Sequence, residues 1–195
     1  MTFILGLTGS IGMGKSTTAA MFADHGIPVW SADDTVHRLY GPAGAAVAPM
    51  AALLPAAVTG GTVSRETLRD HIAQDPALRA KVEFIVHPLV AADRARFLAQ
   101  TAADIAVLDI PLLFENGTDA QCSATLLVTA PPCLQRQRVL ARPGMTADHL
   151  GAILARQMPD MTKRSRATHI VEPLDLRSVR AYVAALITHI RGCNA

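Results

Sequence analysis

The stretch GSIGMGKST, Gly9–Thr17, directly follows the apolar run Phe3–Thr8 and contains three glycines and one lysine. It matches the phosphate-binding pattern GxxxxGK[ST], and the next residues, Ser16–Phe22, are predicted to be helical. Glycines let the backbone fold around a phosphate with its N–H groups pointing inward, and the positive end of the following helix adds to the attraction. The stretch therefore predicts a nucleotide site at a strand-to-helix turn.

Individual roles follow from the pattern. Lys15 supplies an ammonium group for the β and γ phosphates, and the hydroxyl of Ser16 is placed to bind Mg²⁺. The alternative is an ordinary glycine-rich turn, which the full pattern between a strand and a helix argues against. The residues expected to bind ATP are Ile11, Gly12, Met13, Gly14, Lys15, Ser16 and Thr17.

Apolar runs of strand length alternate with longer segments of helical periodicity. This alternation indicates an α/β fold with a parallel sheet flanked by helices, as in P-loop NTPases. The predicted strands are Phe3–Thr8, Ile27–Trp30, Ile105–Ile110, Thr125–Thr129 and His169–Val171, and the last helix is Leu176–Arg191.

Two insertions interrupt the predicted core. Residues 41–103 look helical, broken by prolines and by Gly60-Gly61, and form a candidate substrate lobe. Residues 133–166 are rich in arginine and form a candidate lid. We therefore expect a single domain over 1–195, with its core at about 1–40, 104–132 and 167–195.

Composition excludes several classes of protein. Of the 195 residues, 50% are hydrophobic and 17% charged, which rules out a disordered chain. The net charge of +2 is too small to indicate a nucleic-acid partner. The three cysteines are widely spaced and form no CxxC pair, which argues against disulfides and zinc. Without a signal peptide or a membrane-length apolar run, we expect a cytoplasmic protein with no membrane partner; the oligomeric state is left open.

Asp33 follows the predicted strand that ends at Trp30, at the edge where open α/β sheets bind ligands. A carboxylate there could accept the proton of a substrate hydroxyl that attacks the γ-phosphate. The segment Ser31–Asp34 also fits an [ST]xx[DE] capping box, in which both carboxylates only complement a helix dipole. Spacing alone leaves both readings open.

Asp109 ends the apolar run Ala106–Ile110 in a way that resembles the Walker B acid of P-loop enzymes. A buried strand can end in aspartate simply because a loop begins there. An acid beside a phosphate loop has a cation to meet, so we favour a role in holding Mg²⁺.

Several segments, in order and over nearly the whole length, resemble the dephospho-coenzyme A kinase family. They are LTGSIGMGKST (Leu7–Thr17), SADDTVHRLY (Ser31–Tyr40), VHPLV (Val86–Val90), LDIPLLFENG (Leu108–Gly117), and the lid residues RPGMT from Arg142, Arg156-Gln157 and Lys163-Arg164. Separate motifs in the right order are far more specific than the phosphate loop alone.

The resemblance implies that ATP phosphorylates the ribose 3′-hydroxyl of dephospho-coenzyme A, the last step of coenzyme A biosynthesis. Asp33 would act as catalytic base, Lys15 and the loop would hold ATP, and Arg142 would close with the lid onto the transferring phosphoryl group. Ser16 and Asp109 would position Mg²⁺.

For the acceptor, Arg65 and His87 on the predicted lobe and Leu113 in the PLLFE segment are the candidate binding residues. His87 precedes Pro88 in a helical run and could equally occupy a helix kink. Ser31 occupies the position where the family that this chain resembles has the first of two aspartates. Serine is an excellent N-cap, which explains the replacement without disturbing Asp33.

Two other functions share some of these sequence features. Another P-loop kinase, for a nucleoside, nucleotide or small metabolite, would share the loop, the acid after the second strand and the basic lid. A nucleotide-dependent switch is disfavoured, because Asn116–Asp119 lacks the lysine of the NKxD motif and the DxxG match at Asp148–Gly151 lies far downstream.

Overall fold

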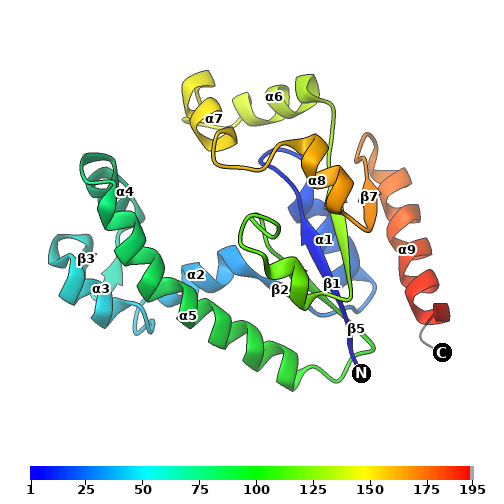
Figure 1. Ribbon diagram of the computed structural model, residues 1–195, viewed down its shortest axis with the longest axis horizontal. Helices are drawn as coiled ribbons and strands as arrows, with labels where there is room; N and C mark the ends of the chain where they lie inside the picture. The colour runs from blue at the N-terminus through cyan, green and yellow to red at the C-terminus, as the bar shows by residue number, and fades with distance from the viewer. Residues whose placement is uncertain (194–195) are drawn as a thin grey trace. The chain divides into compact units, whose positions relative to one another are not determined.

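A computed structural model of the chain describes residues 1–193 (Figure 1). It forms two compact units. The first consists of Met1–Trp30 and the chain from Thr101 onward, and the second of Ser31–Gln100. The second unit contains most of the segment predicted as a substrate lobe, and that role stays a proposal.

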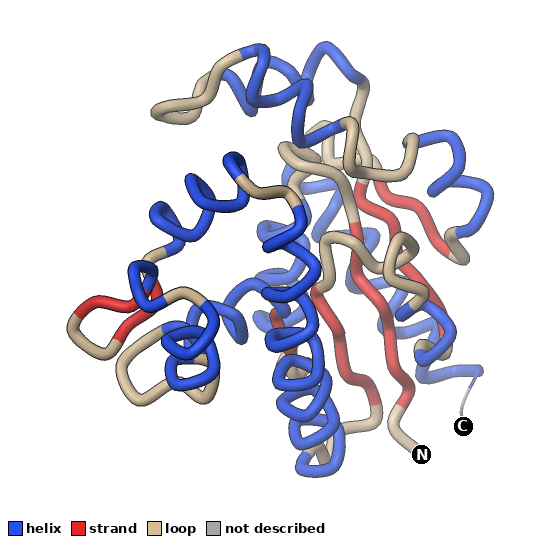
Figure 2. Tube along the Cα trace, turned by 60° about the vertical axis from the view of Figure 1, so that its left-hand side comes forward, coloured by secondary structure: helices blue, strands red, loops and turns tan. Residues whose placement is uncertain are grey.

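A five-stranded sheet in the order β2-β5-β1-β6-β7 organises the first unit (Figure 2). β1 lies at its centre and pairs in parallel with β5 on one side and β6 on the other. Every residue of β5 and β6 is buried, as expected for parallel strands covered on both faces. The predicted fold class and all five predicted strands are confirmed, with small shifts at some ends: β1 is Phe3–Thr8, β2 Val29–Ser31, β5 Ile105–Asp109, β6 Ala124–Val128 and β7 His169–Val171.

Helices α1 (Lys15–Asp24) and α9 (Leu176–Cys193) pack beside each other in the core of the first unit. Leu5 of β1, Phe22 of α1 and Val183 of α9 belong to one buried apolar cluster. This packing fixes α1 against the sheet and so fixes the turn that precedes it. The candidate lid segment forms α6 (Pro132–Leu140), α7 (Ala147–Leu154) and α8 (Asp160–Arg166), and a short 3-10 helix, η2, spans Thr118–Gln121.

The second unit has its own apolar core, which includes Met50 and Val82. Its helices are α2 (Ala32–Tyr40), α3 (Val47–Leu53), α4 (Arg65–Gln74) and α5 (Ala77–Gln100), with a 3-10 turn, η1 (Pro55–Ala57). The segment is not entirely helical as expected: β3 (Val58–Thr59) and β4 (Thr62–Val63) form an antiparallel hairpin. Gly60 and Gly61 have φ of 58° and 74°, the conformation that a two-residue hairpin turn requires.

Two further expectations concern the whole chain. Cys122, Cys133 and Cys193 are free thiols. Among residues 1–193, no helix is both long enough and apolar enough to cross a membrane.

Candidate active site

The phosphate loop begins where β1 ends at Thr8 and leads into α1 at Lys15. Gly12 and Gly14 have φ of 79° and 95°, a region that side-chain-bearing residues rarely adopt. A Cβ atom at Gly12 would lie 2.5 Å from a methyl group of Val139, and one at Gly14 would lie 3.0 Å from Pro173. Both glycines are therefore required by the shape of the loop and by its close neighbours.

No side chain caps the backbone donors at the start of α1. Gly14 occupies the N-cap position and offers no side-chain hydrogen bond. The first intrahelical bond near this end runs from the Thr18 N–H to the Gly14 carbonyl at 3.1 Å. The N–H groups of Lys15, Ser16 and Thr17 precede that bond and have no partner within the helix. They can bind an anion, as the sequence predicted.

Two glutamines fix the backbone of Ile11 from outside the loop. The Gln135 side-chain amide donates to the Ile11 carbonyl at 2.8 Å, and the Ile11 N–H donates to Gln157 Oε1 at 3.3 Å. Met13 is buried and its sulfur accepts a hydrogen bond from the Ala130 N–H at 3.0 Å. The Met13 side chain is thus a packing element, and only its backbone can serve a ligand.

Lys15 is ion-paired with the acid at the end of the neighbouring strand. Its Nζ lies 2.5 Å from Asp109 Oδ1, and the two side chains retain only 12% and 9% of their exposed surface. β5 pairs with β1 in parallel, so both strands end at the same edge, where the loop begins. The structure therefore brings together Lys15 and Asp109. The hydroxyl-bearing Ser16 follows Lys15 and is exposed.

The segment after β2 adopts the capping geometry that the sequence suggested. Ser31 is the N-cap of α2, and its hydroxyl accepts a hydrogen bond from the Asp34 N–H at 3.1 Å. Asp33 and Asp34 both lie in the first turn of α2 and are exposed. The cap assigns a structural task to Ser31 and leaves the Asp33 carboxylate without a capping bond of its own.

Basic residues of the candidate lid divide into two groups. Arg142, in the turn after α6, is exposed. Arg164 pairs with Asp160 and Glu172 at 2.7 and 2.6 Å, and these two carboxylates raise its pKa. Arg164 thus anchors α8 through two carboxylates.

The predicted acceptor residues lie in different surroundings. Arg65 is exposed, and its guanidinium carbon lies 5.8 Å from the centre of the Tyr40 ring. Burial raises the pKa of Tyr40, and the charge of Arg65 opposes this shift. His87 is exposed and immediately precedes Pro88, which lies inside α5. Pro88 has no N–H to donate to the preceding turn of α5, and both readings of His87 stay predictions.

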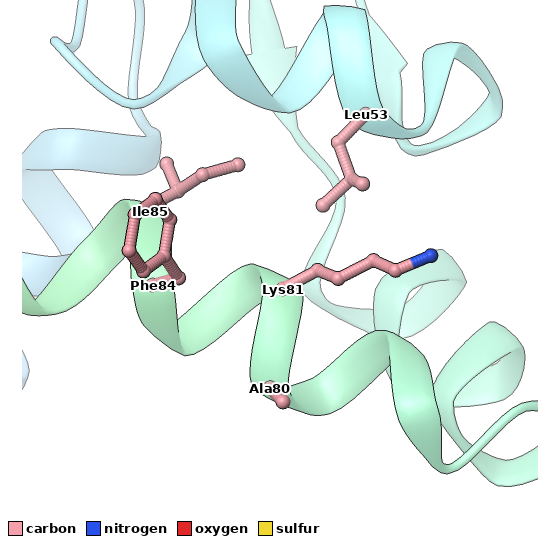
Figure 3. A pocket seen from close by; sticks show the side chains of 5 residues that line it. All are labelled: Leu53, Ala80, Lys81, Phe84 and Ile85. Atoms are coloured by element: carbon pink, nitrogen blue, oxygen red, sulfur yellow. The ribbon is translucent and has the colours of Figure 1, made fainter.

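Leu113 is fully buried in the first unit, and a Cβ atom at Gly6 would lie 2.9 Å from one of its methyl groups. Its surroundings are those of a core residue, and its predicted contact with the acceptor stays a prediction. In the second unit, Leu53 of α3 and residues of α5 line an open depression of about 490 Å³ (Figure 3). The α5 residues are Ala80, Lys81, Phe84 and Ile85, so the depression includes neither Arg65 nor His87.

The sequence is similar to known proteins over most of its length. The family model described as dephospho-CoA kinase (CoaE) matches residues 3–175. The chain belongs to the dephospho-CoA kinase family. A curated dephospho-CoA kinase from Cereibacter sphaeroides is 65% identical over 189 residues, covering 97% of this chain and 96% of the relative. The predicted family and enzyme class, a kinase with a nucleotide co-substrate, are confirmed.

Solved structures support the same fold. A Thermus thermophilus protein of known crystal structure shares 35% identity at a TM-score of 0.85, covering 96% of this chain and 97% of its own. A dephospho-CoA kinase from Campylobacter jejuni covers both chains completely at a TM-score of 0.72. Its identity of 21% makes that likeness one of fold.

In this member of the dephospho-CoA kinase family, a buried polar cluster lies next to the phosphate loop. The sequence alone does not predict it. Lys163 of α8 has no exposed surface, and its Nζ lies 3.0 Å from Glu115 Oε1 and 3.3 Å from Ser10 Oγ. Glu115 falls in the PLLFE segment and Lys163 in the lid segment that carried the resemblance. Both residues lie in segments that resemble the family, but only the tertiary structure shows that their side chains are in contact.

Proposed function

We propose that this member of the dephospho-CoA kinase family transfers the γ-phosphoryl group of ATP to the ribose 3′-hydroxyl of dephospho-coenzyme A. The observation that carries the proposal is the phosphate loop at the end of β1, with Lys15 paired to Asp109 on the adjacent strand. Family membership supplies the acceptor, and the loop supplies the means of holding the donor. The reaction completes coenzyme A biosynthesis, and we place it in the cytoplasm.

The loop's own groups hold the phosphates. The N–H groups of Lys15, Ser16 and Thr17 lie at the positive end of α1, where an anion is favoured. Lys15 Nζ adds a charge that neutralises the β and γ phosphates, and Asp109 aims the lysine side chain along the strand edge. The Ile11 backbone is held from outside by Gln135 and Gln157, so this part of the loop is preorganised.

Asp33 is the proposed base. It lies two residues beyond the end of β2, a strand that runs in the same sheet as β1. Ligands of open α/β sheets gather at the carboxyl ends of the strands. There the Asp33 carboxylate would orient the 3′-hydroxyl and accept its proton as the oxygen attacks phosphorus, while the bond to the leaving ADP oxygen breaks.

Arg142 is the proposed lid cation. It lies in an exposed turn between α6 and α7, so it is free of packing that would prevent movement. A guanidinium brought against the transferring group offsets charge that develops in the transition state, and a lid that closes also excludes water as a competing acceptor.

Magnesium fits the groups near the loop. Mg²⁺ prefers oxygen ligands and is usually held by one or two protein oxygens together with substrate phosphates. The Ser16 hydroxyl and the Asp109 carboxylate supply such oxygens beside Lys15, and residues 1–193 contain no larger cluster of acidic, histidine or cysteine ligands. When bound, the ion would neutralise phosphate charge. Ser16 and Asp109 are the residues we expect to hold it.

Arg65 and His87 remain the proposed contacts of the acceptor on the second unit, with Leu113 as a third candidate on the first. Arg65 carries a charge that suits a diphosphate, and its position over the Tyr40 ring limits its freedom. The alternative acceptor, a nucleoside, nucleotide or small metabolite, would use the same phosphate loop and base.

A matched pair of substitutions tests the proposed base. Asp33→Asn should lower kcat by orders of magnitude and leave the Kd for ATP nearly unchanged, because the carboxylate acts on the acceptor. Asp34→Asn makes the same charge change in the same helical turn and should retain turnover within a few-fold. Equal and small effects in both variants would return Asp33 to a dipole-complementing role.

A further inference from the structure

We infer that Lys163 and Glu115 form a buried positioning pair that holds the phosphate loop through Ser10. The inference rests on the proposed function, since it concerns how the loop is kept ready for ATP. Lys163 Nζ lies 3.0 Å from Glu115 Oε1 and 3.3 Å from Ser10 Oγ. Because Lys163 has no exposed surface, it acts through these neighbours and makes no direct contact with a nucleotide.

Glu115 joins three parts of the chain at one carboxylate. Its Oε1 accepts from Lys163 of α8 and also from the Met158 N–H at 2.7 Å, in the connection between α7 and α8. Its Oε2 is buried and has no hydrogen-bond partner within the described residues. One oxygen of Glu115 therefore fixes both the start of α8 and the ammonium group that reaches the loop.

The same connection contacts the next loop residue. The Ile11 N–H donates to Gln157 Oε1, one position before Met158. Ser10 in turn accepts from the Met13 N–H through its carbonyl at 3.2 Å, which closes the first turn of the loop. The segment Gln157–Lys163 thus contacts Ile11 through its first residue and Ser10 through its last. Glu115 holds the same segment through Met158 and Lys163.

Energetics argue that the pair does more than stabilise the fold. Removing an ammonium and a carboxylate from water is costly, and their mutual attraction repays this only with good geometry and full hydrogen bonding. Apolar residues of similar volume often serve stability as well as such a pair. The pair instead contributes orientation. The Lys163 ammonium donates to the Ser10 hydroxyl, and this bond sets the orientation of the loop whose N–H groups are proposed to bind phosphate.

The test separates position from stability. Lys163→Met strands the Glu115 carboxylate and should lower the thermal unfolding midpoint together with ATP affinity. The double change Lys163→Met with Glu115→Gln removes both charges and keeps an acceptor for the Met158 N–H, so the midpoint should recover toward that of the parent. ATP affinity should stay weaker by about ten- to a hundredfold, the range typical for lost outer-shell partners. Calorimetric titration with Mg²⁺-ATP measures it.

Ser10→Ala gives a second reading that does not disturb the ion pair. It removes the hydroxyl that accepts from Lys163, and ATP should bind several-fold more weakly. Arg180→Met, which breaks the exposed pair with Asp24 elsewhere in the unit, is the control and should bind ATP as the parent does. Parent-like ATP affinity in the double variant or in Ser10→Ala would overturn the inference. A parent protein that bound no ATP would instead overturn the proposed function.

Discussion

Lys15 Nζ and Asp109 Oδ1 lie 2.5 Å apart, and this ion pair joins the phosphate loop to the end of β5. Both side chains are largely screened from water, at 12% and 9% exposure, so the pair is stronger than one on an open surface. In the proposed function, phosphates that reach the loop would meet a lysine whose position a neighbouring carboxylate already sets. The pair therefore links nucleotide binding to the acid proposed to help hold Mg²⁺.

Substitution of either partner should disable catalysis. Lys15→Ala removes the charge proposed to neutralise the phosphates, and we expect kcat/KM to fall by about 10²–10³. Asp109→Asn should cost a comparable factor and raise the Mg²⁺ concentration needed for half-maximal rate. Asp104→Asn, which breaks an exposed pair with Arg191 before β5, is the control and should stay within about twofold. Steady-state kinetics at a series of Mg²⁺ concentrations measures these effects. The same kcat/KM and the same Mg²⁺ dependence in all three variants would contradict the prediction.

Gly14→Ala should weaken ATP binding and stability together. The residue has a φ of 95°, and an added Cβ would press on Pro173, so we expect a loss of about 1–3 kcal/mol. Gly151 of α7 has open space around it, and Gly151→Ala should be neutral or stabilising by up to about 1 kcal/mol. Chemical denaturation measures both. A Gly14→Ala protein as stable as the parent would mean that the loop tolerates another conformation.

Ser31 should matter for stability and little for turnover. Its hydroxyl caps α2 through the Asp34 N–H, so Ser31→Ala should cost about 1 kcal/mol. Ser31→Asp keeps an equally good cap, so its unfolding free energy should match that of the parent. If Ser31→Ala lost turnover without losing stability, Ser31 would have a role in the reaction itself.

His169 should make stability fall in mild acid. Burial lowers its pKa, and the nearby His189 lowers it further, with ring centres 6.3 Å apart. The folded state thus disfavours the protonated ring, so the contribution of His169 is fully present above its ordinary pKa of 6.5 and declines as the pH drops below that value. In His169→Gln, the thermal unfolding midpoint should depend less on pH between about pH 6.5 and 5 than it does in the parent. Identical profiles for parent and variant would refute this assignment.

The sequence predicted the sheet and the phosphate loop well, because both depend on local pattern. Apolar runs such as Ile105–Ile110 have few alternatives to a buried strand, and GxxxxGK[ST] fixes its own backbone shape. The β3–β4 hairpin was missed, because Val58–Thr59 and Thr62–Val63 are too short to show a strand period. Gly60-Gly61 was read as a helix break and is the hairpin turn.

Contacts between distant residues could not be predicted in the same way. In the sequence Lys163 is one basic residue of the candidate lid, and only the tertiary fold places it beside Glu115 and Ser10 with no exposed surface. Gln135 and Gln157 carry no pattern that points to the Ile11 backbone. Such pairs depend on which strands are neighbours, and strand order is a global property of the chain.

The most direct test is the acceptor dependence of ADP formation by the purified protein. With Mg²⁺-ATP, dephospho-coenzyme A should stimulate ADP release strongly, and mass spectrometry should find one molecule of coenzyme A for each ADP. Adenosine, nucleotides and small metabolites should stimulate it hardly at all. ADP release that ignores dephospho-coenzyme A, or that is faster with a nucleoside, would contradict the account and favour another P-loop kinase.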